Sequence, residues 1–226
     1  MVMGTLRQET ELAIVGEPTR SQVVTTHKGS LWIQLETRGR SAHGATPHLG
    51  RNAVHQMAQI VHLLETDYAA RLAARPHPVL GPPTVSVGLI QGGTQANIVP
   101  DFCRVLIDRR TVPGETVRSV RRNMLSLLGQ AGLRASFASV KSNDCLPMET
   151  SEGAPFVKQL LRCAGQVHGL GVDYFCDASI LSEAGIPSVV FGPGDIAQAH
   201  TSDEWISLRS LETARSILLA FLQSLP

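Results

Sequence analysis

Two residues far apart in the chain are candidate ligands for a metal ion. Glu17 follows a short apolar run and lies in Gly16-Glu17-Pro18-Thr19, whereas His200 follows the turn Gly192-Pro193-Gly194. A carboxylate and an imidazole are common zinc ligands, and open α/β sheets bind ligands at the carboxyl ends of their strands. Each residue alone also suits an ordinary surface turn or loop. We nevertheless predict a metal-binding role for both residues.

His43 is a candidate hydrogen-bond donor to a substrate or to a transition-state oxyanion. It follows a predicted strand, in Ser41-Ala42-His43. His48 lies five positions later, beyond Pro47, and this spacing does not place both rings on one helical face. We therefore interpret His48 as a structural or rim residue and do not predict a metal-binding pair here.

Asn97 and Arg110 are the remaining polar candidates. Asn97 lies between two predicted strands, after Gly92-Gly93, and an asparagine at such a position also commonly caps a turn. Arg110 ends a strand. Its guanidinium suits a carboxylate-bearing ligand through bidentate bonds, and it equally suits a solvated position or an ion pair.

Residues 25–140 have the pattern of a separate domain. Alternating apolar residues predict strands, and apolar residues at helical spacing predict helices. The predicted strands are 32–37, 84–90, 103–108 and 133–140, and the helices are 52–72 and 115–130. The order βαββαβ predicts an antiparallel four-stranded sheet with two helices on one face.

Residues 1–24 and 141–226 predict an α/β layer on either side of that insertion. Apolar strands are predicted at 12–15 and 187–191, and helices at 154–166 and 208–222. We expect only two or three strands in this layer, whereas a typical sheet has about five or six. The pattern therefore predicts that upstream strands of this sheet are missing.

Composition excludes several classes of function. The 20 basic and 19 acidic side chains form no basic stripe, which argues against nucleic-acid binding. The apolar runs are far shorter than the ~20 residues of a membrane span, and the first ten residues lack the apolar core of an export signal. Four dispersed cysteines without a Cys-x-x-Cys pair predict buried thiols and a reduced, cytoplasmic compartment.

The ordered motifs resemble those of the acetylornithine deacetylase and succinyl-diaminopimelate desuccinylase family of dinuclear metallohydrolases, which are related to aminoacylases and dipeptidases. The matching segments are Gly16-Glu17-Pro18-Thr19; Lys28-Gly29; Gly39-x-x-Ala42-His43 with Pro47 and Asn52-Ala53; Gly92-Gly93 with Asn97 and Pro100; Asp108-x-Arg110 with Pro113-Gly114-Glu115; Asp177; Gly185-Ile186-Pro187; Gly192-Pro193-Gly194; and Ala199-His200 with Glu204. The resemblance covers nearly the whole chain. It implies a partial α/β metallohydrolase catalytic domain, residues 1–24 and 141–226, with an inserted ferredoxin-like βαββαβ dimerisation domain at 25–140.

The resemblance also implies a function. Two divalent metal ions, zinc or cobalt, would promote hydrolysis of an amide bond in an N-acyl amino acid or small peptide. Glu17 would bind one ion and His200 the other. His43 and Asn97 would be catalytic residues from the inserted domain, with His43 reaching the active site of a partner subunit in a homodimer. The implied substrate-binding groups are Arg110 and the backbone at Gly192 and Gly194.

The chain departs from the family in one respect. The family carries a His-x-Asp ligand pair, a bridging Asp and adjacent glutamates, but no histidine here has aspartate two positions later and no Glu-Glu pair occurs. We expect those elements to precede Met1, so that this chain is a C-terminal portion of an amidohydrolase, inactive alone. Two alternatives are a non-catalytic dimerisation or ligand-binding module, and a half-enzyme completed by a separate polypeptide.

Overall fold

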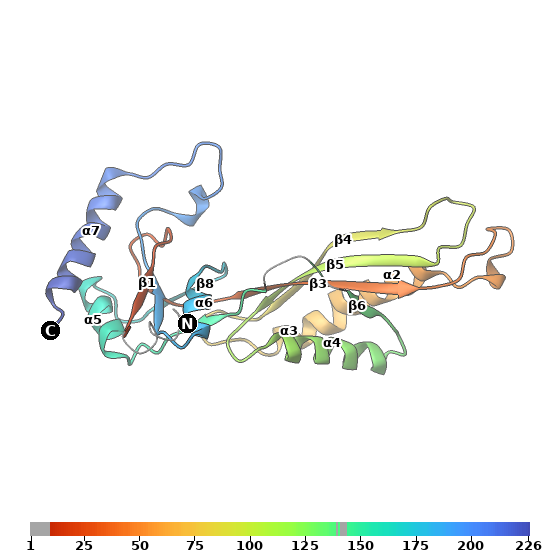
Figure 1. The fold of residues 1–226 in the computed structure, drawn as a ribbon, viewed down its shortest axis with the longest axis horizontal. Helices are drawn as coiled ribbons and strands as arrows, with labels where there is room; N and C mark the ends of the chain where they lie inside the picture. Colours follow the sequence, from red (N-terminus) through yellow and green to blue (C-terminus); the bar gives the residue numbers. More distant parts are fainter. Residues whose placement is uncertain (1–9, 139, 141–143) are drawn as a thin grey trace. The chain divides into compact units, whose positions relative to one another are not determined.

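The computed structural model describes residues 10–138, 140 and 144–226, which form two compact units (Figure 1). The first unit holds the described residues up to Gly29, together with Pro78–Leu80 and Cys145–Pro226. The second unit holds Ser30–His77 and Gly81–Asp144. The predicted inserted domain, residues 25–140, has slightly different bounds from the second unit and stays a proposal.

The second unit contains a four-stranded sheet in the order β4-β5-β3-β6. Its strands are β3 Gly29–Arg38, β4 Thr84–Gly92, β5 Phe102–Thr111 and β6 Ser136–Ala138. β4 pairs antiparallel with β5, and β3 pairs antiparallel with β6. The chain therefore runs βαββαβ through this unit, with its long strands β3 and β5 in the middle of the sheet.

Helices cover one face of this sheet (Figure 1). They are α2 Ala53–Leu63, α3 Ala69–Ala73 and α4 Val117–Gln130, and the π-helical turn η2 Leu64–Tyr68 joins α2 to α3. The single helix predicted at 52–72 is thus interrupted by a wider turn. Asn52 begins α2 by accepting a hydrogen bond from the His55 backbone at 3.0 Å.

A capping box starts α4. Thr116 accepts a hydrogen bond from the Ser119 backbone at 3.1 Å, and Ser119 Oγ accepts one from the Thr116 backbone at 2.9 Å. These two bonds satisfy backbone donors that a helix N-terminus otherwise leaves without a partner. The local sequence therefore determines where α4 begins.

Side chains that alternate between buried and more exposed positions along β3 and β5 build the core of the second unit. Every other residue of each strand is buried against the helices, as expected for side chains that alternate between two faces. The fully or nearly fully buried core includes Leu31, Ile33, Leu35, Met57, Ile60, Val105, Ile107, Val120, Met124 and Leu128. The apolar periodicity of the sequence thus becomes one contiguous sheet-to-helix core.

The first unit contains a five-stranded sheet within the described part of the chain. The order is β1-β9-β2-β7, with β8 also paired to β2. The strands are β1 Ala13–Val15, β2 Val24–His27, β7 Met148–Glu149, β8 Leu170–Val172 and β9 Ser188–Val190. The expectation of two or three strands was wrong, because strands of two to four residues are too short to show an alternating pattern.

Helices cover both faces of this sheet. Val189 packs in a cluster with residues of α5 Pro155–Cys163 and α7 Leu208–Gln223, whereas the next residue, Val190, packs with Ala178 of α6 Ala178–Glu183. Consecutive strand residues point to opposite faces, which separates these two clusters. Both units combine sheets with packed helices, so the α/β class predicted from the sequence is confirmed.

Short helical turns lie beside the loops that carry candidate residues. η1 Pro47–Leu49 follows His43, and η3 Ile196–Gln198 precedes His200.

All four cysteines are free thiols. Across the described ranges, the structure contains no helix with the length and apolar character that crossing a membrane requires.

Candidate functional site

Parallel pairing of two strands brings the Glu17 loop beside the glycine turn. β1 pairs with β9 in parallel, with Val15 opposite Val190. Glu17 follows β1 by two residues, and Gly192 follows β9 by two residues. Because parallel strands end at the same edge of a sheet, the two loops leave that edge together. Segments that are far apart in sequence therefore share one site.

Backbone hydrogen bonds hold the two loops against each other. Gly192 O accepts bonds from Thr19 N at 3.2 Å and Ser21 N at 2.8 Å, and Gly192 N donates to Thr19 Oγ1 at 3.1 Å. A Cβ at Gly192 would lie only 2.6 Å from Glu17 O. Glycine is required here because the two backbones approach too closely for any side chain.

The amide groups of the glycine turn already have partners within the first unit. Gly194 N donates to Ser210 Oγ at 2.9 Å, and Gly194 O accepts from Arg20 N at 2.7 Å. Gly194 has φ +84°, a left-handed conformation that favours glycine. Substrate binding by the Gly192 and Gly194 amides stays a prediction, and it requires that a ligand exchange with Thr19 and Ser210.

Glu17 lines a cleft of about 650 Å³ in the first unit. The other lining residues are Gly16, Pro18, Pro193, Gly194, Asp195, Gln198, Glu204, Trp205 and Ile206. Burial raises the pKa of Glu17, and the negative charge of Asp177 raises it further, whereas His200 lowers it. His200 and Asp177 therefore lie within electrostatic range of Glu17, although no hydrogen bond joins Glu17 to His200.

Two further groups near Glu17 were assigned no role from the sequence. Burial, together with the Glu17 charge, raises the pKa of Tyr174 to about 12 and that of Cys176 to about 11. Both groups are therefore neutral at neutral pH. The buried Tyr174 hydroxyl has no hydrogen-bond partner in the described part of the chain. The only sequence signal for this segment was the motif match at Asp177.

His200 lies in an exposed loop and has a left-handed backbone, with φ 63°. Its backbone N donates to Glu204 Oε2 at 3.3 Å. The carboxylate that follows His200 in sequence thus fixes the backbone of the loop and not the imidazole ring. A non-glycine residue in this conformation carries a conformational cost, and such residues occur preferentially at functional sites.

These residues alone do not make a complete metal site. The described residues contain no group of three or more His, Cys, Asp or Glu side chains arranged to hold a metal ion. Catalytic zinc typically has three protein ligands and structural zinc about four. The pair Glu17 and His200 falls short of that number.

In the second unit, the loops that carry His43 and Asn97 lie together. His43 forms an antiparallel bridge with Ile98, and Gly44 N donates to Asn97 O at 2.7 Å. His43 Nδ1 accepts a hydrogen bond from Ala45 N at 3.1 Å. An accepting Nδ1 carries no proton, so the neutral ring has its proton on Nε2 and can donate it to an oxyanion.

Arg110 lies on the sheet face opposite the helices, where Arg110 Nε donates to Asp108 Oδ2 at 3.0 Å. Its role in binding a substrate carboxylate stays a prediction. The preceding residue, Arg109, points to the helical face instead, where its side chain is fully buried and ion-paired with Glu115. Sequence reasoning did not identify that pair, although the alternation through Val105 and Ile107 places Arg109, and not Arg110, on the core face of the strand.

Comparison with known proteins finds similarity to a peptidase dimerisation domain and to acetylornithine deacetylases. Residues 25–135 match the family model of the peptidase dimerisation domain of M20 enzymes. The acetylornithine deacetylase of Myxococcus xanthus is 31% identical over 214 residues, 91% of this chain and 55% of that protein. That of Proteus mirabilis is 30% identical over 219 residues, 92% of this chain and 54% of that protein. The chain thus spans about half the length of these relatives.

Solved structures share the fold. The aminopeptidase PepT from Bacillus cereus superposes with a TM-score of 0.74 at 20% identity, covering 96% of this chain and 58% of that chain. An M20 family metallo-carboxypeptidase from Sulfolobus solfataricus gives a TM-score of 0.67 at 17% identity, covering 98% and 65%. The resemblance predicted from the sequence motifs is confirmed: residues 25–135 match the M20 peptidase dimerisation domain, and nearly the whole chain is similar to about half the length of acetylornithine deacetylases.

Proposed function

We propose that this chain serves a metal-dependent hydrolase that cleaves an amide bond of an N-acyl amino acid or a small peptide. The observation that carries the proposal is the junction of the Glu17 loop with the Gly192–Gly194 turn, within electrostatic range of His200. The names of the related deacetylases and peptidases support an amide substrate. The four free, dispersed cysteines support a reduced cytoplasmic location.

Glu17 and His200 would each bind one of two divalent ions, zinc or cobalt. Carboxylate and imidazole ligands suit both metals. A complete site needs more donors than the described residues bring together. In this proposal the chain supplies two terminal ligands, and further ligands and the general base come from elsewhere in the assembled enzyme.

We further propose that the second unit forms a homodimer and presents His43 and Asn97 to the partner subunit. The match to a peptidase dimerisation domain supports this role. β4 supports it too, because it is a nine-residue edge strand with Leu89 and Ile90 exposed. A long edge strand offers unpaired backbone groups to another chain. His43, with its proton on Nε2, would then stabilise an oxyanion.

Two measurements on one preparation test the function. Zinc and cobalt binding are measured by calorimetry, and hydrolysis of N-acetylornithine and of N-acetylated amino acids is assayed in parallel. For the chain alone, we expect weak metal binding and no turnover. If the missing segment of a relative is added as a second polypeptide, turnover should appear, and Glu17→Ala or His200→Ala should abolish it.

If Glu17→Ala and His200→Ala each keep the turnover of the wild type, the proposed ligands are wrong. His43→Ala gives a separate control, since loss of an oxyanion donor should lower turnover about 100-fold or more and leave metal content unchanged. Loss of metal in His43→Ala would contradict that assignment.

A second candidate is a non-catalytic dimerisation or ligand-binding module. The lack of a three-donor metal group among the described residues favours it. This alternative predicts a stably folded, metal-free dimer that remains inactive when the second polypeptide is added. Restored turnover would eliminate it.

A further inference from the structure

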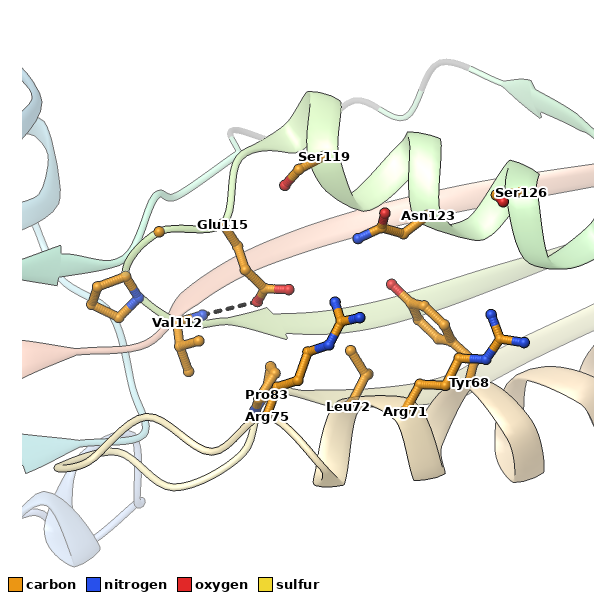
Figure 2. A pocket seen from close by; sticks show the side chains of 12 residues that line it. Tyr68, Arg71, Leu72, Arg75, Pro83, Val112, Glu115, Ser119, Asn123 and Ser126 are labelled. Carbon is orange, nitrogen blue, oxygen red and sulfur yellow. Dashed lines mark hydrogen bonds between the residues drawn. The ribbon is translucent and has the colours of Figure 1, made fainter.

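A cavity of about 430 Å³ lies in the second unit, on the helical side of the sheet (Figure 2), and neither His43 nor Asn97 lines it. The segment η2–α3 forms one wall and α4 forms the other, as Figure 2 shows. The lining residues are Tyr68, Arg71, Leu72, Arg75, Pro83, Val112, Pro113, Gly114, Glu115, Ser119, Asn123 and Ser126. Neither the sequence motifs nor the proposed hydrolase function uses the polar residues of its two walls.

Arg71 and Arg75 give this cavity a positive charge. Arg71 lies in α3, Arg75 lies two residues after the last helical residue Ala73, and both side chains line the cavity (Figure 2). Arg71 Nη2 donates to Gln130 Oε1 at 3.1 Å, which leaves its other donors for a ligand. The Arg75 side chain has no hydrogen-bond or ion-pair partner among residues 10–138, 140 and 144–226.

The one carboxylate in the cavity is already neutralised. Glu115 Oε1 is paired with the buried Arg109 guanidinium, and Glu115 Oε2 accepts a hydrogen bond from Val112 N at 3.1 Å. Both oxygens are therefore occupied, and the charges of Arg71 and Arg75 remain uncompensated at the opening. A ligand with a negative charge would supply the missing partner.

The rest of the lining selects the kind of anion. Leu72 and Val112 are each 6% exposed and contribute apolar surface, as does the ring of Tyr68. Across the cavity, Asn123 lies on α4 with its amide turned toward the arginine wall in Figure 2. An inorganic anion would use the charges but not the apolar floor, whereas an organic acid would use both.

We propose that this cavity binds a small organic carboxylate. Its carboxylate lies against Arg71 and Arg75, with Asn123 as an additional donor, and its apolar part lies on Leu72 and Val112. The site is distinct from the cleft at Glu17, so the proposal does not depend on hydrolase activity.

The test is a titration of the ¹⁵N-labelled full chain with 3-phenylpropionate, which contains no amide bond. The neutral 3-phenylpropionamide tests the need for charge, and inorganic phosphate tests the need for an apolar part. We expect saturable shifts of the amides of Leu72, Arg75 and Asn123 with 3-phenylpropionate, and binding at least about tenfold weaker with the other two compounds.

Substitutions then assign the site. Arg75→Gln and Arg71→Gln should each weaken binding of 3-phenylpropionate about tenfold, because each removes a charge-assisted bond. Arg122→Gln removes the same charge from an exposed position on α4 outside the cavity, and it should leave the dissociation constant unchanged. All three positions are exposed, so the fold should persist, and circular dichroism checks this.

Four results would overturn the proposal. One is the absence of saturable binding, and another is a set of shifts confined to the Glu17 loop of the first unit. The third is equal weakening by Arg122→Gln, which would show a response to net charge alone. Phosphate binding as tight as that of 3-phenylpropionate would contradict the organic-acid assignment.

Discussion

Gly192 lies so close to Glu17 that a Cβ on Gly192 would come within 2.6 Å of Glu17 O. The contact joins a loop near the start of the described chain to a turn close to its end. Both loops leave the same edge of the sheet, because β1 and β9 run parallel. The position of the Glu17 carboxylate therefore depends on the absence of a side chain at Gly192.

Replacing Gly192 by alanine should destabilise the first unit. The methyl group would collide with backbone, which cannot rotate away as a side chain can, and such overpacking typically costs about 1–3 kcal/mol. The free energy of unfolding in urea measures the effect. Gly16→Ala is the matched control, since a Cβ at Gly16 meets no atom within 4 Å. Equal stability of the two variants would show that the loops separate easily.

Glu17→Gln should stabilise the metal-free chain at neutral pH. Burial and Asp177 raise the pKa of Glu17 above its ordinary value of 4.5, so the folded state binds this proton more tightly than the unfolded state. The stabilisation from the protonated group is present below pH 4.5 and is lost as the pH rises through the raised pKa. Glutamine, which is always neutral, avoids that loss.

Thermal unfolding of the wild type and of Glu17→Gln, with a chelator present, is measured at neutral pH and below pH 4.5 to compare their stabilities. The advantage of Glu17→Gln should be present at neutral pH and should disappear below pH 4.5. Glu212→Gln serves as the contrast, because the hydrogen bond from Arg215 lowers the pKa of Glu212, and its removal should give no gain at neutral pH. A pH-independent gain at Glu17 would refute the electrostatic explanation.

Removing Glu115 should strongly destabilise the second unit. Its carboxylate is the ion-pair partner of Arg109, whose side chain is completely buried. Breaking such a pair leaves an uncompensated buried charge, which typically costs about 3–5 kcal/mol. Glu115→Ala is compared with Glu212→Ala, which breaks the exposed pair with Arg215 on α7. We expect a small change for that control.

The two tryptophans permit this measurement unit by unit. Trp32 lies in β3 of the second unit and Trp205 in the first unit. In a Trp205→Phe background, fluorescence reports on the second unit and measures the loss for Glu115→Ala during urea unfolding, and in a Trp32→Phe background it reports on the first unit and measures the loss for Glu212→Ala. Similar losses for Glu115→Ala and Glu212→Ala would mean that the buried pair contributes little.

Ile90→Lys should weaken a homodimer formed through β4. Ile90 is 52% exposed on this edge strand, and a two-fold axis would bring the two new charges toward each other. We expect the dimer dissociation constant to rise by at least about tenfold. Analytical ultracentrifugation measures it, with Val167→Lys, at a highly exposed position of the first unit, as the control. An unchanged dimer would place the interface elsewhere.

The sequence alone determined the pattern of the second unit. Long strands and helices repeat their apolar residues often enough to be recognised, so the order βαββαβ and the start of α4 at the Thr116 cap could be predicted. The sequence also determined the family resemblance, because that resemblance depends on the order of local motifs. The sequence also shows directly that it contains no His-x-Asp element and no Glu-Glu element.

Only the tertiary structure decided which residues meet. Strands β2, β7 and β8 have two to four residues, too few to carry a periodic signal, and they acquire their role by pairing with neighbours. The contact of Gly192 with Glu17 depends on strand register, which the local sequence does not encode. Local sequence encodes where an element begins and ends, but contacts between distant segments follow from packing the whole sheet.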